Sequence, residues 1–394
     1  MSLRGHSAII GYGETEFVKY RDSGTRSNYT EQCDAARLAI QDAGISKDAI
    51  DGLIAIPPLD QKVSWSMDLA EYLQLRLTFL DNLYFGGASG AAGMLYAAAA
   101  IDAGLCSTVL LVGGSTMDPK RMFEFGSEVA TPFERDFDTI YGPMTDNSAY
   151  ALIKQRYKHE FNATDEQIAQ VVVNARHHAA KFPNALLKKP ITAEEVVDSR
   201  MICDPLRLFE IVMPCTGASA LILTSADRAK DVKRPPVYLL GGGQSIDRGM
   251  WNPAYGRDQS LTTSPVKQAT SKAFDMAGLT INDMDFAQLY DCYTITVVIA
   301  LEDIGRCEKG QGAEYIEKTD LTYTGSFPVN TDGGQLGRGQ PYGACHFMPI
   351  VEAVRQLMGR AGDLQVKDAR FGLASGNGGS MANECTIILG NETP

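Results

Sequence analysis

Helix-like and strand-like patterns of apolar side chains alternate along this chain, and one combination of them occurs twice. Residues 35–55, AARLAIQDAGISKDAIDGLIA, place apolar residues three and four positions apart, followed by a glycine and an apolar run. Residues 269–289, ATSKAFDMAGLTINDMDFAQL, repeat the arrangement. In both copies we expect a helix that ends at a glycine, Gly44 or Gly278, and then a short turn and a strand.

The segments around these two copies also correspond. Each copy follows a strand and a glycine turn, SAIIGYG at residues 7–13 and VYLLGGG at 237–243. Each is followed by a glycine-rich turn, a helix and a strand; the second turn and helix read GQPYGACHFMPIVEAVRQLMG (339–359). The pattern predicts an α/β protein of two duplicated halves, 1–230 and 231–394. Two central sheets would have helices on and between them.

The first half contains a long insertion with a different composition. From about residue 117 to 199 the chain has helical spacing, many aromatic residues, charges of both signs and proline breaks. We expect a helical excursion there, after which residues 200–225 return to the sheet of the first half. Insertions of this length commonly cover active sites.

The stretch NLYFGGASGAAGMLYAAAAIDAG (82–104) is typical of a turn that presents a reactive group. We expect a short strand at Leu83–Phe85, a Gly/Ala/Ser turn and an Ala-rich helix. The nucleophile position holds Gly87, but the amides of Gly87, Ala88 and Ser89 lie beside a helix N-terminus and are candidates for holding an oxyanion. The alternative is a tight packing turn without a chemical role.

Composition excludes several functional classes. The 394 residues include 48 acidic and 36 basic ones, for a net charge of −12, and no Lys/Arg run indicates a nucleic-acid partner. No apolar run reaches the roughly 20 residues of a membrane span, and the N-terminus has no signal-peptide pattern. The eight cysteines form no CxxC pair, so we expect reduced thiols, no metal site and a cytoplasmic location.

The order of these motifs resembles the thiolase superfamily, in particular its sterol-carrier/lipid-transfer branch, over nearly the whole chain. The resemblance implies a five-layered αβαβα thiolase fold with a loop domain inserted in the first half, and a homodimer. It implies a coenzyme A thioester as substrate and no covalently bound cofactor. It also implies a small zinc-ribbon/OB-fold partner of the DUF35 kind.

The residues that carry out thiolase chemistry are nevertheless absent. In the motif Cys-x-Ser-Gly the cysteine position is Gly87, in Gly-His-Pro the histidine position is Gln340, and in Cys-x-Gly-Gly the cysteine position is Gly376. Loss of a nucleophile or its base typically costs on the order of 10⁴–10⁶ in turnover. Acyl transfer by the route of the family is therefore not expected.

Tyrosines are the main candidates for the chemistry that remains. Tyr290, in YDCY, occupies the catalytic asparagine or histidine position of the family, where a phenol can donate or accept a proton. Tyr293 is expected to pack and Asp291 to hold the loop. The chain also resembles the thiolase-fold acyl-CoA aldolases of steroid side-chain breakdown, which implies a second tyrosine near the Gly-His-Pro position, here Tyr342. A core role without chemistry is the alternative for a lone tyrosine.

The remaining candidates have simpler alternatives. His346 begins an otherwise apolar helix and is either a proton carrier or a buried, hydrogen-bonded histidine. Asn377 and Gly378 belong to a terminal glycine turn, for which we expect close backbone packing. Cys215 has the appearance of a nucleophile before a glycine turn, but the family has a structural loop there. His177 and His178 are expected on a solvated helix face or in a contact with the ligand.

These observations lead to one hypothesis and two alternatives. The hypothesis is a thiolase-like lyase that cleaves a carbon–carbon bond of a β-hydroxyacyl-CoA by a retro-aldol reaction. The alternatives are an acetyl-CoA acyltransferase with an atypical site and a non-catalytic acyl-CoA or lipid-binding subunit. The proposed catalytic residues are Tyr290, Tyr342 and His346. The proposed substrate-binding residues are Gly87, Ala88, Ser89, Gln340, Asn377 and Gly378.

Overall fold

The computed structural model describes residues 2–59, 64–116, 118, 140, 142, 145–247 and 260–393. Its main feature is a nine-stranded mixed sheet with the order β10-β12-β13-β9-β1-β8-β4-β2-β3. The strands from the first half are β1 (Ser7–Glu14), β2 (Gly52–Ile56), β3 (Phe79–Asn82), β4 (Thr108–Ser115) and β8 (Gly217–Ser225). Those from the second half are β9 (Val237–Ile246), β10 (Phe286–Gln288), β12 (Phe371–Gly378) and β13 (Asn383–Gly390).

The pairing pattern of the first half is repeated in the second. β8 is antiparallel to β1 and β4, and β4 is parallel to β2. In the same way β13 is antiparallel to β9 and β12, and β12 is parallel to β10. Where β3 adds to β2, the second half has only a parallel bridge between Ala287 and Val329. The duplication predicted from the sequence is therefore visible in strand order and direction.

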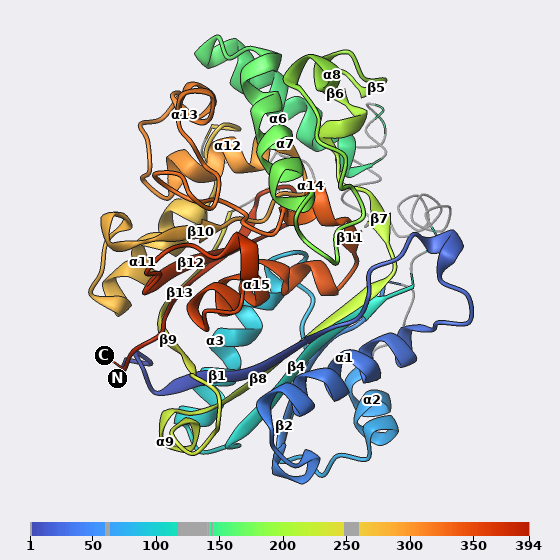
Figure 1. The fold of residues 1–394 in the computed structure, drawn as a ribbon, viewed down its shortest axis with the longest axis vertical. Helices are drawn as coiled ribbons and strands as arrows, with labels where there is room; N and C mark the ends of the chain where they lie inside the picture. The colour runs from blue at the N-terminus through green and yellow to red at the C-terminus, as the bar shows by residue number, and fades with distance from the viewer. Residues whose placement is uncertain are drawn as a thin grey trace.

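The expectation of two separate sheets is wrong in one respect. Antiparallel pairing of Ala8 with Tyr238 and of Ile9 with Val237 joins β1 to β9, so the hydrogen bonding of the two halves is continuous. The pairing involves only these residues, and two central helices separate the halves elsewhere (Figure 1). Sequence patterns within each half contain no signal for a pairing between the halves.

The helices are arranged in an αβαβα order of layers. α1 (Asn28–Ala43) and α2 (Trp65–Leu73) pack on the first half, and α11 (Val266–Ala277) packs on the second. α3 (Ser89–Asp102) and α15 (Met348–Leu357) lie between the halves, where α3 contacts strands of both (Figure 1). Small residues allow this close approach: a Cβ built on Gly90 would lie 1.9 Å from the carbonyl oxygen of His346.

Two local predictions can be compared directly with the backbone. α1 ends at Gly44 with φ 67°, and α11 ends at Gly278 with φ 64°, so both glycines adopt the left-handed conformation predicted for them. The strand predicted at Leu83–Phe85 instead ends at Asn82, and the turn begins at Leu83. The turn therefore includes Tyr84 and Phe85.

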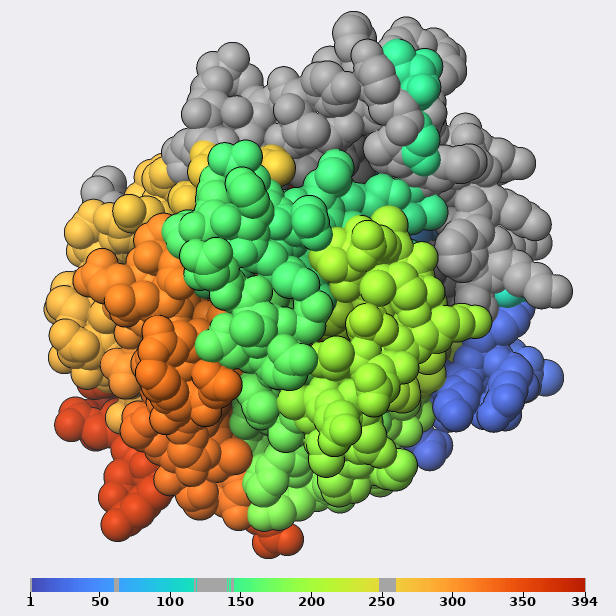
Figure 2. Space-filling model, turned by 90° about the horizontal axis from the view of Figure 1, so that it is seen from above, coloured from blue at the N-terminus to red at the C-terminus, as the bar shows by residue number. Residues whose placement is uncertain are grey.

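The inserted region is mainly helical where it is described, as predicted. It contains α6 (Asp146–Phe161), α7 (Asp165–Ala179) and α8 (Ala193–Val197), whereas most of residues 117–144 lie outside the described residues. Figure 2 shows these green segments on one face, beside orange segments of the second half. Buried Lys154 on α6 binds Glu210 at 2.7 Å, which fixes the insertion to the chain that returns to the sheet.

Short elements complete the described fold. After the insertion come β5 (Met201–Cys203), β6 (Leu206–Arg207), β7 (Pro214–Cys215) and, after β8, α9 (Ala226–Ala229). The second half adds α12 (Thr294–Asp303), α13 (Gly312–Lys318), α14 (Gly334–Arg338), β11 (Gln340–Pro341) and the 3-10 helix η6 (Ala344–His346). Within the described part, no helix combines the length and apolar character needed to cross a membrane.

Candidate active site

The ring of Tyr290 occupies the space beside Gly87. A Cβ built on Gly87 would lie 2.2 Å from Cζ of Tyr290 and 2.3 Å from the backbone oxygen of Asn377. Both distances are far below van der Waals contact, so no side chain fits at position 87 without displacement of the phenol or the backbone. The turn that carries a thiol in thiolases is here packed against a phenol.

Tyr290 lies in the loop between β10 and α12, and its side chain is buried. Thr296 Oγ1 donates a hydrogen bond to the Tyr290 carbonyl at 3.0 Å, which fixes the loop. The Tyr290 hydroxyl lies 3.3 Å from Sγ of Cys345. Burial, together with the nearby thiol of Cys345, raises the pKa of the phenol well above its ordinary value of 10. At neutral pH Tyr290 is therefore a protonated hydrogen-bond donor rather than a base.

Tyr342 follows β11, and its ring lies 5.3 Å from that of His346 in an edge-on arrangement. Tyr342 lies near Tyr84, and burial followed by the proximity of Tyr84 raises the pKa of Tyr342. Tyr84 is 50% exposed. This pair connects the turn at Gly87, the turn at Tyr342 and the surface. Tyr84 was missed in the sequence because its position gave no signal beyond an aromatic residue before the turn.

The structure argues against His346 as a proton carrier. The side chain is buried, and this desolvation lowers the pKa of the imidazole to about 3. Its Nδ1 has no hydrogen-bond partner in the described structure. The residue therefore stays neutral at physiological pH, which does not suit a group that carries protons. Helical spacing places a histidine on a face but does not reveal whether a partner stabilises its charge.

The amides of the turn divide into used and unused groups. The N–H of Ser89 donates to the carbonyl of Gly86 at 3.0 Å, so its prediction as an oxyanion donor is wrong. The Ser89 hydroxyl donates to the same carbonyl at 2.7 Å and accepts from the N–H of Phe85, which closes the turn. The N–H groups of Gly87 and Ala88 donate to no acceptor among the described residues. These two amides remain available for a ligand oxygen.

The terminal glycine turn packs directly on the turn at Gly87, as expected. A Cβ built on Gly378 would lie 2.0 Å from the carbonyl oxygen of Phe85. The Asn377 side chain accepts a hydrogen bond from the N–H of Met381 at 3.1 Å and directs its amide nitrogen toward Sγ of Cys292, 4.0 Å away. Asn377 therefore shapes the site mainly through its backbone.

Gln340 and Asp291 support the turn that carries Tyr342. Gln340 donates from Nε2 to Oε1 of Gln335 at 3.0 Å, and β11 pairs with β7. The Asp291 carboxylate accepts hydrogen bonds from the N–H groups of Gln335 and Leu336 at 2.8 and 3.2 Å, at the start of α14. Asp291 thus holds the loop, as predicted.

The inserted region contributes one wall of the site through the start of α6. The ring of Tyr150 stacks on that of Tyr293 with centroids 4.0 Å apart, and the Tyr293 hydroxyl donates to Asn147 Oδ1 at 2.7 Å. The negative charge of Asp146 contributes to the raised pKa values of Tyr84 and Tyr342. Tyr293 packs as predicted, and the described part of the insertion contacts the loop that carries Tyr290.

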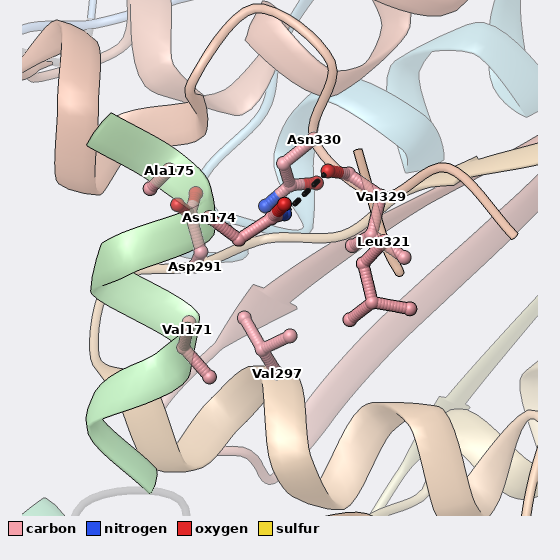
Figure 3. Close-up of a pocket in the computed structure, with 8 residues that line it drawn as sticks. All are labelled: Val171, Asn174, Ala175, Asp291, Val297, Leu321, Val329 and Asn330. Carbon is pink, nitrogen blue, oxygen red and sulfur yellow. Dashed lines mark hydrogen bonds between the residues drawn. The ribbon is translucent and has the colours of Figure 1, made fainter. Parts of the chain in front are cut away.

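A separate hollow lies on the other side of Asp291. It holds about 270 Å³ of empty volume, including open solvent, between α7, α12 and the chain near Asn330 (Figure 3). Asn174 donates to the carbonyl of Val329 at 3.2 Å along its edge. The hollow does not include Tyr290 or Tyr342, so we do not place the chemistry there.

The other candidates from the sequence are structural. Cys215 is buried, and desolvation raises the pKa of its thiol far above the ordinary value, which makes it unreactive as expected. His177 is exposed, but His178 is buried and accepts a hydrogen bond from the N–H of Tyr323 at 3.0 Å. Desolvation lowers the pKa of His178 to about 4, so the prediction of a solvated face is wrong for this residue.

The buried Asp291 predicts a pH dependence of stability. Burial raises the pKa of its carboxyl from 3.8 to about 7, despite the two backbone hydrogen bonds. Between about pH 4 and about pH 7 the folded protein therefore holds a proton that the unfolded chain has lost, and stability falls as pH rises. In Asp291→Asn the free energy of unfolding should decline less over this range, as measured by urea unfolding. The exposed control is Asp363→Asn, whose free energy of unfolding should vary with pH as in the wild type. The same variation with pH in Asp291→Asn would contradict the assignment.

Comparison with known proteins agrees with this geometry. A family model described as "Thiolase C-terminal domain-like" matches residues 248–391. An acetyl-CoA acetyltransferase from Methanothermobacter thermautotrophicus is 31% identical over 97% of this chain and 98% of its own length. The 17-hydroxy-3-oxo-4-pregnene-20-carboxyl-CoA lyase of Mycobacterium tuberculosis is 32% identical over 91% of this chain and 92% of its own.

A solved structure provides the same result at the level of the fold. The "Ltp2-ChsH2(DUF35) aldolase" superposes with a TM-score of 0.86 and 30% sequence identity, over 98% of this chain and 98% of the other. The relatives thus include both a lyase and an acyltransferase by name. This chain belongs to the thiolase superfamily.

Proposed function

We propose that this chain cleaves the bond between Cα and Cβ of a β-hydroxyacyl-CoA by a retro-aldol reaction. The observation that supports this most strongly is the exchange at position 87, where the family's thiol is absent and the ring of Tyr290 fills the space. Acyl transfer needs a nucleophile there, whereas retro-aldol cleavage needs no covalent acyl-enzyme. The similarity to a CoA lyase over most of the chain favours the same reaction.

The reaction needs two separable proton steps. The β-hydroxyl loses its proton, its oxygen becomes a carbonyl, and the Cα–Cβ bond breaks. The electron pair of that bond forms the enolate of the thioester, which then takes a proton at Cα. The products are a ketone or aldehyde and a shortened acyl-CoA, so atoms and charge balance without another co-reactant.

The two tyrosines suit these two steps. The protonated phenol of Tyr290 would donate to the thioester oxygen, together with the N–H groups of Gly87 and Ala88, where negative charge develops. Tyr342 would receive the β-hydroxyl proton as it passes its own proton to Tyr84, which reaches the surface. This assignment explains why one phenol is enclosed and the other is linked to an exposed partner.

The acyltransferase alternative makes a different prediction about covalent chemistry. After incubation with radiolabelled acetyl-CoA and denaturation, we expect no thioester on the protein, because burial raises the pKa of the Cys345 thiol to about 12 and that of Cys215 further. A conventional thiolase treated in parallel provides the positive control. Stable label on Cys215 or Cys345 would reject the lyase proposal in favour of acyl transfer.

We further propose a DUF35 partner and a homodimer. The superposed aldolase is a complex that contains a DUF35 protein, which supports the first proposal. The sheet ends at β3, whose Leu80 is 39% exposed, and such an edge can pair with another chain. The assay is therefore cleavage of a β-hydroxyacyl-CoA with and without the partner, followed by mass spectrometry of both products. Tight binding without cleavage under both conditions would favour the alternative of a non-catalytic acyl-CoA subunit.

A further inference from the structure

A buried thiol lies next to the hydroxyl of Tyr290. Cys345 Sγ and Tyr290 Oη are 3.3 Å apart, and Cys345 is fully buried. The cysteine belongs to η6, far in sequence from both Gly87 and Tyr290. The candidate site thus contains a thiol beside the phenol, although the family's nucleophile position contains none.

The backbone around Cys345 is held firmly against the sheet. Gly343, at φ 79°, precedes η6, and a Cβ built on it would lie 2.7 Å from the backbone nitrogen of Gly114 on β4. Conversely, a Cβ on Gly113 would lie 2.7 Å from the carbonyl oxygen of Gly343. This close packing fixes the sulfur relative to Tyr290, a requirement for any group that orients a catalytic side chain.

The direction of the hydrogen bond between these groups matters for the reaction. A phenol has one proton, so a Tyr290 hydroxyl that donates to sulfur cannot also donate to a thioester oxygen. A thiol that donates its S–H to the phenolic oxygen leaves the phenol proton available for the ligand. Desolvation raises the pKa of the Cys345 thiol to about 12, so its proton is present at neutral pH.

We propose that Cys345 is a positioning residue for Tyr290, and that its S–H donates to the phenolic oxygen so that the phenol O–H turns toward a ligand at the Gly87 turn. This inference rests on the proposed lyase function. The thiol is neither a nucleophile nor a base in this role and contacts no substrate atom. It acts through the orientation of the phenol.

The test uses Cys345→Ala and Cys345→Ser, each in the wild-type and the Tyr290→Phe background. We expect Cys345→Ala to lower kcat for β-hydroxyacyl-CoA cleavage about tenfold, the usual scale of one buried hydrogen bond, with KM within about twofold. Cys345→Ser should recover most of the loss because its hydroxyl also donates. In Tyr290→Phe, the alanine change should have little further effect, because the phenolic oxygen is already absent.

Two results would overturn the inference while leaving the proposed function intact. The first is a kcat in Cys345→Ala equal to that of the wild type. The second is an equal fold-loss of kcat from Cys345→Ala in the wild-type and in the Tyr290→Phe background. Cys385→Ala provides the matched control, since Cys385 is a fully buried thiol on β13, and its kcat should equal that of the wild type.

A stability cycle separates failure of the inference from failure of the proposed function. If the wild type cleaves no β-hydroxyacyl-CoA, the function is rejected, but the contact between Cys345 and Tyr290 can still be measured. The midpoints of urea unfolding should then be non-additive for Cys345→Ala and Tyr290→Phe if the groups are hydrogen-bonded. If the two substitutions shift the midpoint of urea unfolding additively, the hydrogen bond between Cys345 and Tyr290 is rejected whether or not the protein is active.

Discussion

Replacement of Tyr290 by phenylalanine should lower kcat for β-hydroxyacyl-CoA cleavage by roughly 10²–10⁴-fold, the usual contribution of a positioned acid or base. The ring still fills the space beside Gly87, so packing is preserved, and only the hydroxyl 3.3 Å from Cys345 Sγ is lost. The free energy of unfolding should change by no more than about 1 kcal/mol, the net contribution of one hydrogen bond. Steady-state kinetics and urea unfolding measure the two effects separately.

The second tyrosine provides the comparison for this experiment. Tyr342→Phe should also reduce kcat, and the double variant should lose less than the sum of the two single losses if both phenols serve one transition state. The matched control is Tyr157→Phe, since Tyr157 is a buried tyrosine bonded to Glu302 on α12, away from the Gly87 turn. Wild-type rates in both Tyr290→Phe and Tyr342→Phe would remove the tyrosines from the mechanism.

Addition of one methyl group at Gly87 should have a comparably large effect. In Gly87→Ala the new Cβ would lie 2.2 Å from the Tyr290 ring and 2.3 Å from the Asn377 carbonyl oxygen, so one of them must move. Overpacking of this kind typically costs about 1–3 kcal/mol. The displaced phenol should also abolish most cleavage. Urea unfolding and the cleavage assay together measure both consequences.

The control for this substitution lies in the adjacent helix. Gly93 is buried in α3, and a Cβ there would meet the side-chain ends of Leu111 and Leu83 at 3.3 Å and a methyl group of Ile54 at 3.6 Å. Gly93→Ala should therefore be nearly neutral or slightly stabilising, because alanine favours a helix by about 1 kcal/mol over glycine. If Gly87→Ala were as stable and as active as Gly93→Ala, the contact between Gly87 and Tyr290 would not have the role described here.

The same contact explains why a thiolase is not restored by a single change. Gly87→Cys would place a thiol in the space that the Tyr290 ring occupies, and Gln340 would still stand where the family has a histidine. Conversion to thiolase chemistry would require concerted changes at several positions. The Tyr290 ring therefore occupies the space that a thiol at position 87 would need, so the two groups exclude each other.

The sequence was sufficient for features with local signals. The left-handed conformation of Gly44 and Gly278 was predictable because a helix commonly ends with a glycine in this conformation just after its last turn. Asp291 was assigned correctly to the loop from its place in the family motif, and its hydrogen bonds to Gln335 and Leu336 confirm this. The helical character of the insertion was likewise evident from spacing.

Features that depend on distant contacts were missed. Tyr84 approaches Tyr342 only because the two halves of the fold bring their turns together, whereas Cys345 approaches Tyr290 because η6 packs beside the loop that follows β10 within the second half. The burial that leaves His346 neutral likewise depends on surrounding elements rather than on its own helix. For Ser89, the use of its amide by Gly86 depends on the exact shape of the turn, which composition does not determine.

The most direct test of the central claim is cleavage of a β-hydroxyacyl-CoA without added free coenzyme A, with the chain alone and with a DUF35 partner. Thiolytic cleavage consumes one coenzyme A per turnover, whereas retro-aldol cleavage consumes none. A retro-aldol reaction should give equal amounts of a ketone or aldehyde and a shortened acyl-CoA, with no acyl group on the protein. Cleavage of a β-ketoacyl-CoA that depends on free coenzyme A, with label on a cysteine, would contradict it.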